Sequence, residues 1–311
     1  MKTDIGQLLL IFPPQLRGLL GALPWERVEE IRLRGGRPVE IVLHDGDYWL
    51  GQRGELITQA QLAEPLSPVA LTGCLELVTK NSLYALEEEL RGGYVTVEGG
   101  HRVGLVGRAI VRDGKVRSMR EIGGLNVRVA REVVGASSTL LPQLYNPEAD
   151  LYYRTLIISP PRAGKTTILR DLVRQVSDGW EGVGGRRVGL VDERSELAGT
   201  FRGVPQKDVG VRTDVLDACP KAQGIMMLLR SMSPQIIAVD EIGRPEDAQA
   251  LGEALNGGVG VFATAHAGCL EELEERPILR ELVEAKVFQR FVLLSRENGV
   301  GTIAWVRGVD G

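Results

Sequence analysis

Short apolar segments alternate with helix-like segments through the second half of the chain, and this alternation restricts the possible folds more than any other feature. Strands are expected at 156–159, 188–192, 236–240 and 259–264, and helices at 166–176, 221–232, 246–255 and 270–284. Continuous apolar strands separated by helices are typical of crossover units on a parallel sheet. Segments 288–294 and 301–306 are expected to add a terminal antiparallel pair. The pattern therefore predicts an α/β domain with a largely parallel sheet.

The first 136 residues follow another pattern, typical of a smaller α+β domain. Helices are expected at 15–23 and 68–89, and strands at 30–33, 39–43, 94–97, 102–111 and 125–129, with glycine pairs marking turns. Residues 137–153 contain serine, asparagine and proline at positions that interrupt any regular pattern, so they are expected to form a connector. The predicted domains are 1–136 and 137–311.

The composition excludes several classes of protein. Hydrophobic residues make up 43% and charged residues 25% of the 311 positions, which is typical of a folded chain and not of a disordered or collagen-like one. The longest apolar runs, 8–12 and 225–229, are far shorter than the roughly 20 residues of a membrane-spanning helix, and no signal peptide is evident. A cytoplasmic location is therefore expected. The three cysteines lack Cys-x-x-Cys spacing, which argues against a disulfide framework or a structural zinc site.

The strongest motif lies between the strand at 156–159 and the helix that follows it. It consists of Ser159, Pro160, Pro161, Arg162, Ala163, Gly164, Lys165, Thr166 and Thr167, and it matches the phosphate-loop pattern except that serine replaces the first glycine. Backbone amides at a helix N-terminus point at a bound phosphate, and the helix dipole adds to the attraction for an anion. Lys165 is expected to bridge the β- and γ-phosphates of a nucleotide, and the Thr166 hydroxyl to bind Mg²⁺.

Three further strands end in polar residues, and a parallel sheet would place these at the same rim as the phosphate loop. Asp240 is expected to hold Mg²⁺ through water, and Glu241 to polarise the attacking water. Glu193 is a second candidate for a metal-shell or water-positioning carboxylate, although a salt-bridged strand end would show the same pattern. His266 is a candidate sensor of the γ-phosphate, and a structural histidine is the alternative.

The order of these motifs resembles that of the type II/IV secretion and pilus ATPases. The resemblance rests on the phosphate loop together with segments 191–196, 240–247 and 263–267. Segments 30–34, 36–38, 99–104 and 125–130 extend it to the first domain, and the whole chain is most similar to the branch encoded by endospore-forming bacteria. The resemblance implies a RecA-like P-loop ATPase that uses ATP and Mg²⁺ and works as a homo-oligomeric ring, expected to be a hexamer.

The sequence departs from the usual secretion-ATPase pattern at three places. Asp240 and Glu241 stand where those ATPases have Gly-Glu, and the acidic segment reads Asp-Glu-Arg-Ser-Glu in place of Glu-Asp-Pro-x-Glu. The histidine segment holds one histidine, His266. Glu193 and Glu241 therefore both remain candidates for the general base.

Basic residues are concentrated between Arg102 and Arg131, where eight of them accompany two acidic residues. Given the family resemblance, Arg128 and Arg131, or Arg102 and Arg120, are candidates to reach the γ-phosphate bound by the same or a neighbouring subunit. An arginine in that position can raise the rate by about 10³ to 10⁵. A solvated or salt-bridged strand face is the alternative.

The resemblance also implies a biological setting. The protein is expected to be peripheral to the mother-cell membrane, on its cytoplasmic side, and to energise a secretion-like channel toward the forespore, with membrane-embedded sporulation channel proteins as partners. A nucleic-acid-stimulated RecA-like ATPase is the second interpretation, because the basic run could follow phosphates. The absence of Phe, Tyr and Trp between Arg102 and Arg131 argues against base stacking there. A nucleotide-gated scaffold without hydrolysis is the third.

Overall fold

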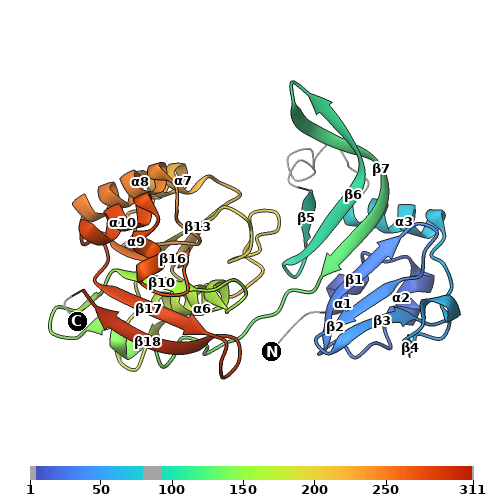
Figure 1. Cartoon of the computed structure of the whole chain (residues 1–311), viewed down its shortest axis with the longest axis horizontal. Coiled ribbons are helices and arrows are strands. Elements are labelled where there is room, and N and C mark those ends of the chain that lie inside the picture. The colour runs from blue at the N-terminus through green and yellow to red at the C-terminus, as the bar shows by residue number, and fades with distance from the viewer. Residues whose placement is uncertain (1–4, 80–92, 310–311) are drawn as a thin grey trace. The chain divides into compact units, whose positions relative to one another are not determined.

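The computed structural model of the protein describes residues 5–79 and 93–309 and divides into two compact units, Met1–Arg131 and Glu132–Gly311 (Figure 1). The sequence predicts the division slightly later, after residue 136. Each unit has its own seven-stranded sheet and its own apolar core.

The first unit is an antiparallel sheet packed against short helices. Its strand order is β4-β3-β2-β1-β7-β6-β5, and each neighbouring pair is antiparallel. Its elements are α1 (Ile5–Leu9), α2 (Pro14–Leu20), β1 (Val28–Arg34), β2 (Glu40–Leu43), β3 (Gly46–Leu50), β4 (Leu56–Ile57), a 3₁₀ turn (Ala60–Leu62), α3 (Pro68–Thr79), β5 (Tyr94–Val97), β6 (His101–Arg112) and β7 (Lys115–Arg128). Apolar side chains from the helical segments and the strands form one buried cluster, which includes Leu8, Phe12, Leu20, Ile31 and Val127. Of the helix expected at 68–89, the part after Thr79 lies outside the described residues.

Strands β6 and β7 form a long hairpin that extends past the rest of the sheet (Figure 1). Asp113 and Gly114 form its turn, with φ values of 52° and 70°. The sequence predicts the second strand only at 125–129, because two consecutive glycines read as a turn. This expectation is wrong, since β7 runs through Gly123 and Gly124. A Cβ at Gly124 would lie 2.9 Å from the side chain of Val106, so glycine here permits close packing between strands.

The second unit has a mixed sheet in the order β14-β13-β15-β16-β10-β17-β18. Every neighbouring pair is parallel except β17 and β18, which are antiparallel. Its elements are α5 (Leu141–Leu144), β8 (Tyr145–Asn146), β9 (Leu151–Tyr152), β10 (Thr155–Ser159), α6 (Lys165–Asp178), β11 (Gly179–Trp180), β12 (Val183–Gly184), β13 (Val188–Asp192), β14 (Thr213–Asp217), α7 (Lys221–Ser231), β15 (Ile236–Val239), α8 (Pro245–Asn256), β16 (Gly260–His266), α9 (Glu271–Glu274), α10 (Pro277–Glu284), β17 (Arg290–Ser295) and β18 (Thr302–Gly308). The predicted α/β class and largely parallel sheet are confirmed.

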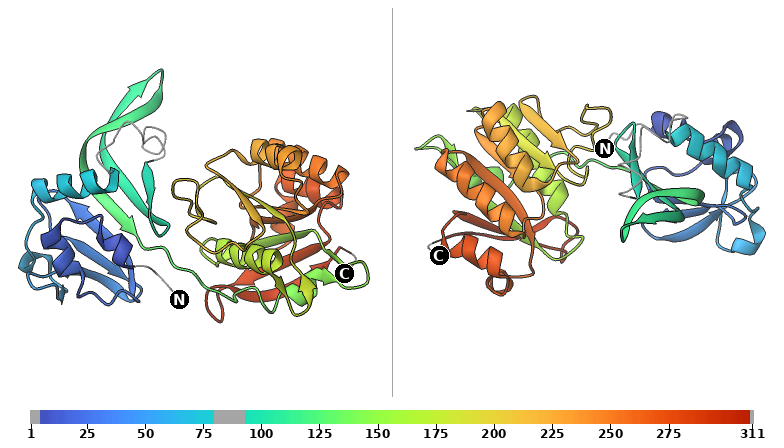
Figure 2. Two further views of the ribbon diagram at one scale, coloured as in Figure 1. Left: turned by 180° about the vertical axis from the view of Figure 1, so that it is seen from behind. Right: turned by 90° about the horizontal axis from the view of Figure 1, so that it is seen from above.

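Alternate side chains along the parallel strands point to opposite faces and enter different cores. Helix α6 covers one face of the sheet, and α7, α8 and α10 cover the other (Figure 2). Ile157 packs in the core on the α6 side, whereas Leu156 and Ile158 pack in the core on the other side. Because both faces are covered, β10 and β13 are buried along their whole length. This explains why their sequences are continuous apolar runs.

Three details of the second unit differ from the expectations. Segment 137–153 is not an irregular connector, because Leu140, Leu141 and Leu144 are buried in the core around α5. Strand β14 was not expected, since its residues are half-buried at the sheet edge and mix polar with apolar types. The helix expected at 270–284 is two helices, because Pro277 starts α10 and cannot donate a backbone hydrogen bond to the preceding turn.

No helix among the described residues is both long enough and apolar enough to span a lipid bilayer.

Candidate functional site

The segment between β10 and α6 has the backbone of a phosphate-binding loop. Arg162 and Gly164 adopt left-handed conformations, with φ values of 60° and 93°. Lys165 then begins α6, and no side chain of the residues that the structure describes caps the first amides of that helix. A Cβ at Gly164 would also lie 3.2 Å from the backbone of Gly301 in the β17–β18 turn, so this position favours glycine for two reasons. The uncapped helix start can bind an anion through backbone N–H groups.

Lys165 is buried and already engaged in hydrogen bonds. Its Nζ donates to Ser159 Oγ over 3.1 Å and lies 2.9 Å from His266 Nδ1. Its side chain is 5% exposed, and this burial lowers the pKa of the ammonium group, although the charges of Asp240 and Glu241 act in the opposite direction. Ser159, the residue that replaces the first glycine of the motif, therefore holds the lysine in place.

Asp240 links the start of α6 to two neighbouring strands. Its Oδ2 accepts a 2.8 Å hydrogen bond from the Thr166 hydroxyl, and its Oδ1 accepts one from the Thr264 hydroxyl. The Thr264 oxygen in turn accepts a 2.8 Å hydrogen bond from the backbone N–H of Glu241. Burial raises the pKa of Asp240 despite these hydrogen bonds. Thr264 is fully buried and was not among the predicted site residues.

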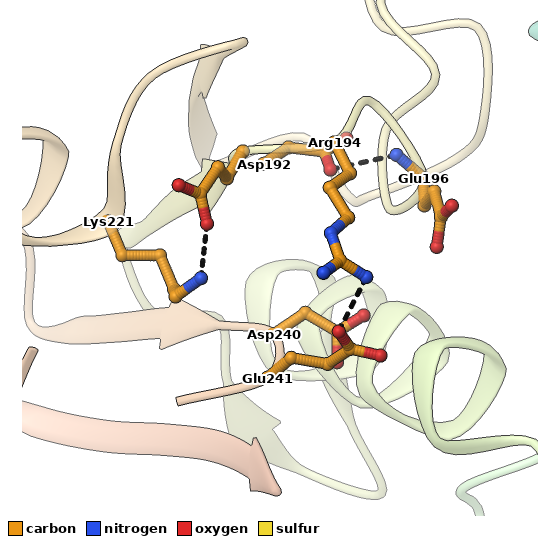
Figure 3. Close-up of a pocket in the computed structure, with 7 residues that line it drawn as sticks. Asp192, Arg194, Glu196, Lys221, Asp240 and Glu241 are labelled. Carbon is orange, nitrogen blue, oxygen red and sulfur yellow. Dashed lines mark hydrogen bonds and ion pairs between the residues drawn. The ribbon is translucent and has the colours of Figure 1, made fainter. Parts of the chain in front are cut away.

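Both carboxylate oxygens of Glu241 are engaged. Oε1 lies 2.8 Å from His266 Nε2, and Oε2 accepts a 2.6 Å hydrogen bond from Arg194 Nη1 (Figure 3). Burial acts to raise the pKa of Glu241, but the hydrogen bond from His266 and the charges of Arg194 and Lys165 outweigh it, so the pKa is lowered. Arg194 was not among the predicted site residues; the signal that could have found it is its place between Glu193 and Ser195 in the acidic segment.

Glu193 has different partners. Its Oε2 forms an ion pair with Lys221, which is 7% exposed, and its Oε1 lies 3.6 Å from Arg244 Nη1. These two cations were also missed at the sequence level. Glu193 borders a small cavity at this edge of the sheet. The cavity is lined by acidic and basic residues, Asp192, Glu193, Arg194, Glu196, Lys221, Asp240 and Glu241 (Figure 3).

The predicted residues of the second unit lie on adjacent strands. The strands β13, β15, β16 and β10 are consecutive in the sheet, and Glu193, Asp240, His266 and Lys165 lie at or just beyond their carboxyl ends. A continuous line of polar contacts runs from Lys165 through His266 and Glu241 to Arg194. The structure therefore brings the phosphate loop, two carboxylates and the histidine together at one edge.

The candidate arginines of the first unit contact groups within that unit. Arg128 Nε lies 3.4 Å from Glu30 Oε1, and Arg131 donates a 2.6 Å hydrogen bond to the backbone oxygen of Val28. The guanidinium of Arg102 lies 3.8 Å from the ring centre of Tyr94. Arg120 is an exposed residue of β7.

Thr166 and Asp240 supply the hydroxyl and carboxylate oxygens that Mg²⁺ prefers. Within residues 5–79 and 93–309, no group of three or more His, Cys, Asp and Glu side chains is arranged to hold a metal ion. Sites for Mg²⁺ in phosphoryl-transfer proteins typically use one or two protein oxygens together with water and phosphate oxygens. The donor set therefore fits Mg²⁺ that arrives with a nucleotide.

The fold is that of the secretion ATPases, an α/β class with a mixed, mostly parallel sheet. The ATPase DotB from Legionella pneumophila matches with a TM-score of 0.56 and 16% identity, over 88% of this chain and 74% of that one. The pilus retraction motor PilT, solved with bound ADP, matches with a TM-score of 0.55 and 15% identity, over 86% of this chain and 74% of that one.

The chain belongs to the family described as "Sporulation stage III, protein AA", whose model matches residues 3–310. The stage III sporulation protein AA of Bacillus subtilis (strain 168) is 44% identical over 310 residues, covering 99% of this chain and 96% of that protein. The resemblance predicted from the motifs is therefore confirmed.

Proposed function

We propose that the protein hydrolyses ATP, with Mg²⁺, at the edge formed by the carboxyl ends of β13, β15, β16 and β10. The observation that carries this proposal is the line of contacts from Lys165 through His266 to Glu241, beside the Thr166–Asp240 hydrogen bond. Lys165 and the first amides of α6 would bind the β- and γ-phosphates. The names of DotB as an ATPase and of PilT as an ADP-bound motor support the proposal.

Thr166 and Asp240 would hold Mg²⁺, which neutralises charge on the phosphate oxygens when it is bound. Their 2.8 Å hydrogen bond already brings the two oxygen ligands together. Thr264, from the neighbouring strand, fixes the other carboxylate oxygen of Asp240. Its role would be to position Asp240.

Glu241 would act as the general base. Its carboxylate would accept a proton from water while the water oxygen bonds to the γ-phosphorus, and the bond between that phosphorus and the β-γ bridging oxygen would break, which releases ADP and phosphate. The ion pair of Glu193 with the buried Lys221 supports a structural role for Glu193. His266, which contacts both Lys165 and Glu241, would transmit the presence of the γ-phosphate between them.

In cells, we propose that a ring of subunits, expected to be a hexamer, energises a sporulation-specific channel at the cytoplasmic face of the mother-cell membrane. The family assignment and the fold of the secretion ATPases support this setting. Arg128 and Arg131 remain the proposed arginines that act on the γ-phosphate, in the same or a neighbouring subunit. Native mass measurement of the full chain with and without ATP and Mg²⁺ tests the ring, and a monomer under both conditions would contradict it.

Phosphate release by the purified full chain tests the activity. Turnover is expected with ATP and Mg²⁺, and it should stop when EDTA is added and in the Lys165→Ala variant. The same assay is repeated with single-stranded DNA or RNA. A large, salt-sensitive stimulation of phosphate release would favour the nucleic-acid-dependent alternative. Binding of ATP without any turnover, under all of these conditions, would contradict the proposed hydrolysis.

A further inference from the structure

We propose that Arg194 exchanges its ion pair with Glu241 for the γ-phosphate of ATP, and that this exchange frees the general base. The inference rests on the proposed function. Arg194 would be a residue of the second unit that contacts the reacting phosphate, and its contact with Glu241 would be absent when ATP is bound.

The structure shows Glu241 in a state that does not suit a base. Its two carboxylate oxygens accept hydrogen bonds from His266 and Arg194, at 2.8 and 2.6 Å. Arg194 and His266 therefore occupy positions beside the carboxylate that an attacking water would need in order to hydrogen-bond to it. Release of one of the two partners would open that side of the carboxylate to the attacking water.

Arg194 is better able to leave than His266. The imidazole sits at the end of β16 and also contacts the buried Lys165, so it is held from two sides. Arg194 lies beyond the end of β13, and its side chain is 62% exposed. An ion pair with this exposure contributes little stability, because water screens it and the long side chain loses freedom in forming it.

A bound triphosphate would compete strongly for Arg194. The guanidinium group binds phosphate oxygens through two parallel N–H bonds, and a γ-phosphate carries more negative charge than a carboxylate. Arg194 borders the same cavity as Asp240 and Glu241, the candidate metal ligand and the candidate base (Figure 3). In its new position it would offset the charge that develops on the γ-phosphate during hydrolysis.

The test compares Arg194→Ala, Arg194→Lys and the control Arg280→Ala, an exposed arginine on α10. Each variant is assayed for kcat and KM with ATP and for the affinities of ATP and ADP, by titration of the full chain. For Arg194→Ala we expect kcat to fall at least 100-fold and ATP affinity to fall about tenfold relative to ADP affinity. Arg194→Lys should recover part of both losses, and Arg280→Ala should behave as the wild type.

A purely structural role for Arg194 gives a different result. If the ion pair only holds the loop after β13, Arg194→Ala would lower the melting temperature but leave kcat and the ratio of ATP to ADP affinity unchanged, and this overturns the inference. If the wild-type chain binds ATP without hydrolysing it, the proposed function fails, whereas the ratio of the two affinities still decides whether Arg194 contacts the γ-phosphate.

Discussion

The Thr166 hydroxyl donates a 2.8 Å hydrogen bond to Oδ2 of Asp240, across 74 positions of sequence. Thr166 lies in the first turn of α6, and Asp240 follows the last residue of β15. We expect Asp240→Asn to reduce at least tenfold the gain in ATP affinity that Mg²⁺ provides, since an amide is a weaker Mg²⁺ ligand than a carboxylate. Titration of ATP affinity against Mg²⁺ concentration measures this. An unchanged Mg²⁺ dependence would remove Asp240 from the metal site.

Lys165→Ala should weaken ATP binding at least tenfold, which corresponds to about 1.4 kcal/mol. The ammonium group is the buried cation of the phosphate loop, and alanine offers no replacement for it. Fluorescent-nucleotide titration measures the affinity, with Lys286→Gln, at an exposed position, as the matched control. Wild-type affinity in Lys165→Ala would show that the nucleotide binds elsewhere.

Glu241→Gln and Glu193→Gln separate the two candidate bases. Because Glu241 contacts His266 while Glu193 is paired with Lys221, we expect Glu241→Gln to retain ATP and lose at least 100-fold in kcat. The kcat of Glu193→Gln should stay within about threefold of the wild-type value, because this variant leaves the proposed general base, Glu241, unchanged. Single-turnover phosphate release measures both. The opposite pattern would assign the base to Glu193.

Thr264→Val should lower the free energy of unfolding by about 1 to 3 kcal/mol. The variant removes the donor to Asp240 and the acceptor for the backbone N–H of Glu241 in a fully buried place. Thr264→Ser keeps both hydrogen bonds and should lose much less stability. Urea unfolding of both variants checks this, and equal stabilities would mean that the hydroxyl contributes nothing.

Asp217→Asn should change the pH dependence of stability. Asp217 lies beside Asp192 in the β13–β14 register, and burial together with that neighbouring charge raises its pKa from 3.8 to about 6. Between pH 3.8 and about pH 6 the folded state therefore binds more protons than the unfolded state. The stability of the wild type falls as the pH rises through this range.

At pH 8 the variant should be more stable than the wild type by about 1 kcal/mol, after allowance for solvent screening of a half-buried group. Below the unfolded-state pKa of 3.8 the difference should vanish. Chemical unfolding at a series of pH values measures this, and a difference that does not vary with pH would contradict the assigned pKa.

The α/β domain and most of its strand ends could be predicted, because strands buried on both faces leave continuous apolar runs. The positions of Lys165, Asp240, Glu241 and His266 at one edge follow from the same parallel geometry. Strand β14 could not be predicted in this way, since an edge strand with half-buried residues lacks that signal.

The partners of the site residues were harder to predict. Lys221 begins a helix 28 positions after Glu193 in the sequence, and nothing in its local pattern indicates an ion pair. Thr264 reads as an ordinary β-branched strand residue, although its hydroxyl fixes Asp240. Such contacts depend on which strands become neighbours in the sheet, and this order is a property of the whole fold.

A crystal structure of the Glu241→Gln variant with ATP and Mg²⁺ would show directly whether the phosphate loop holds the nucleotide. We predict that the Lys165 ammonium group lies within hydrogen-bond distance of the β- and γ-phosphate oxygens, with Thr166 and Asp240 beside the Mg²⁺. A nucleotide bound elsewhere, with Lys165 still in contact with Ser159 and His266, would contradict it.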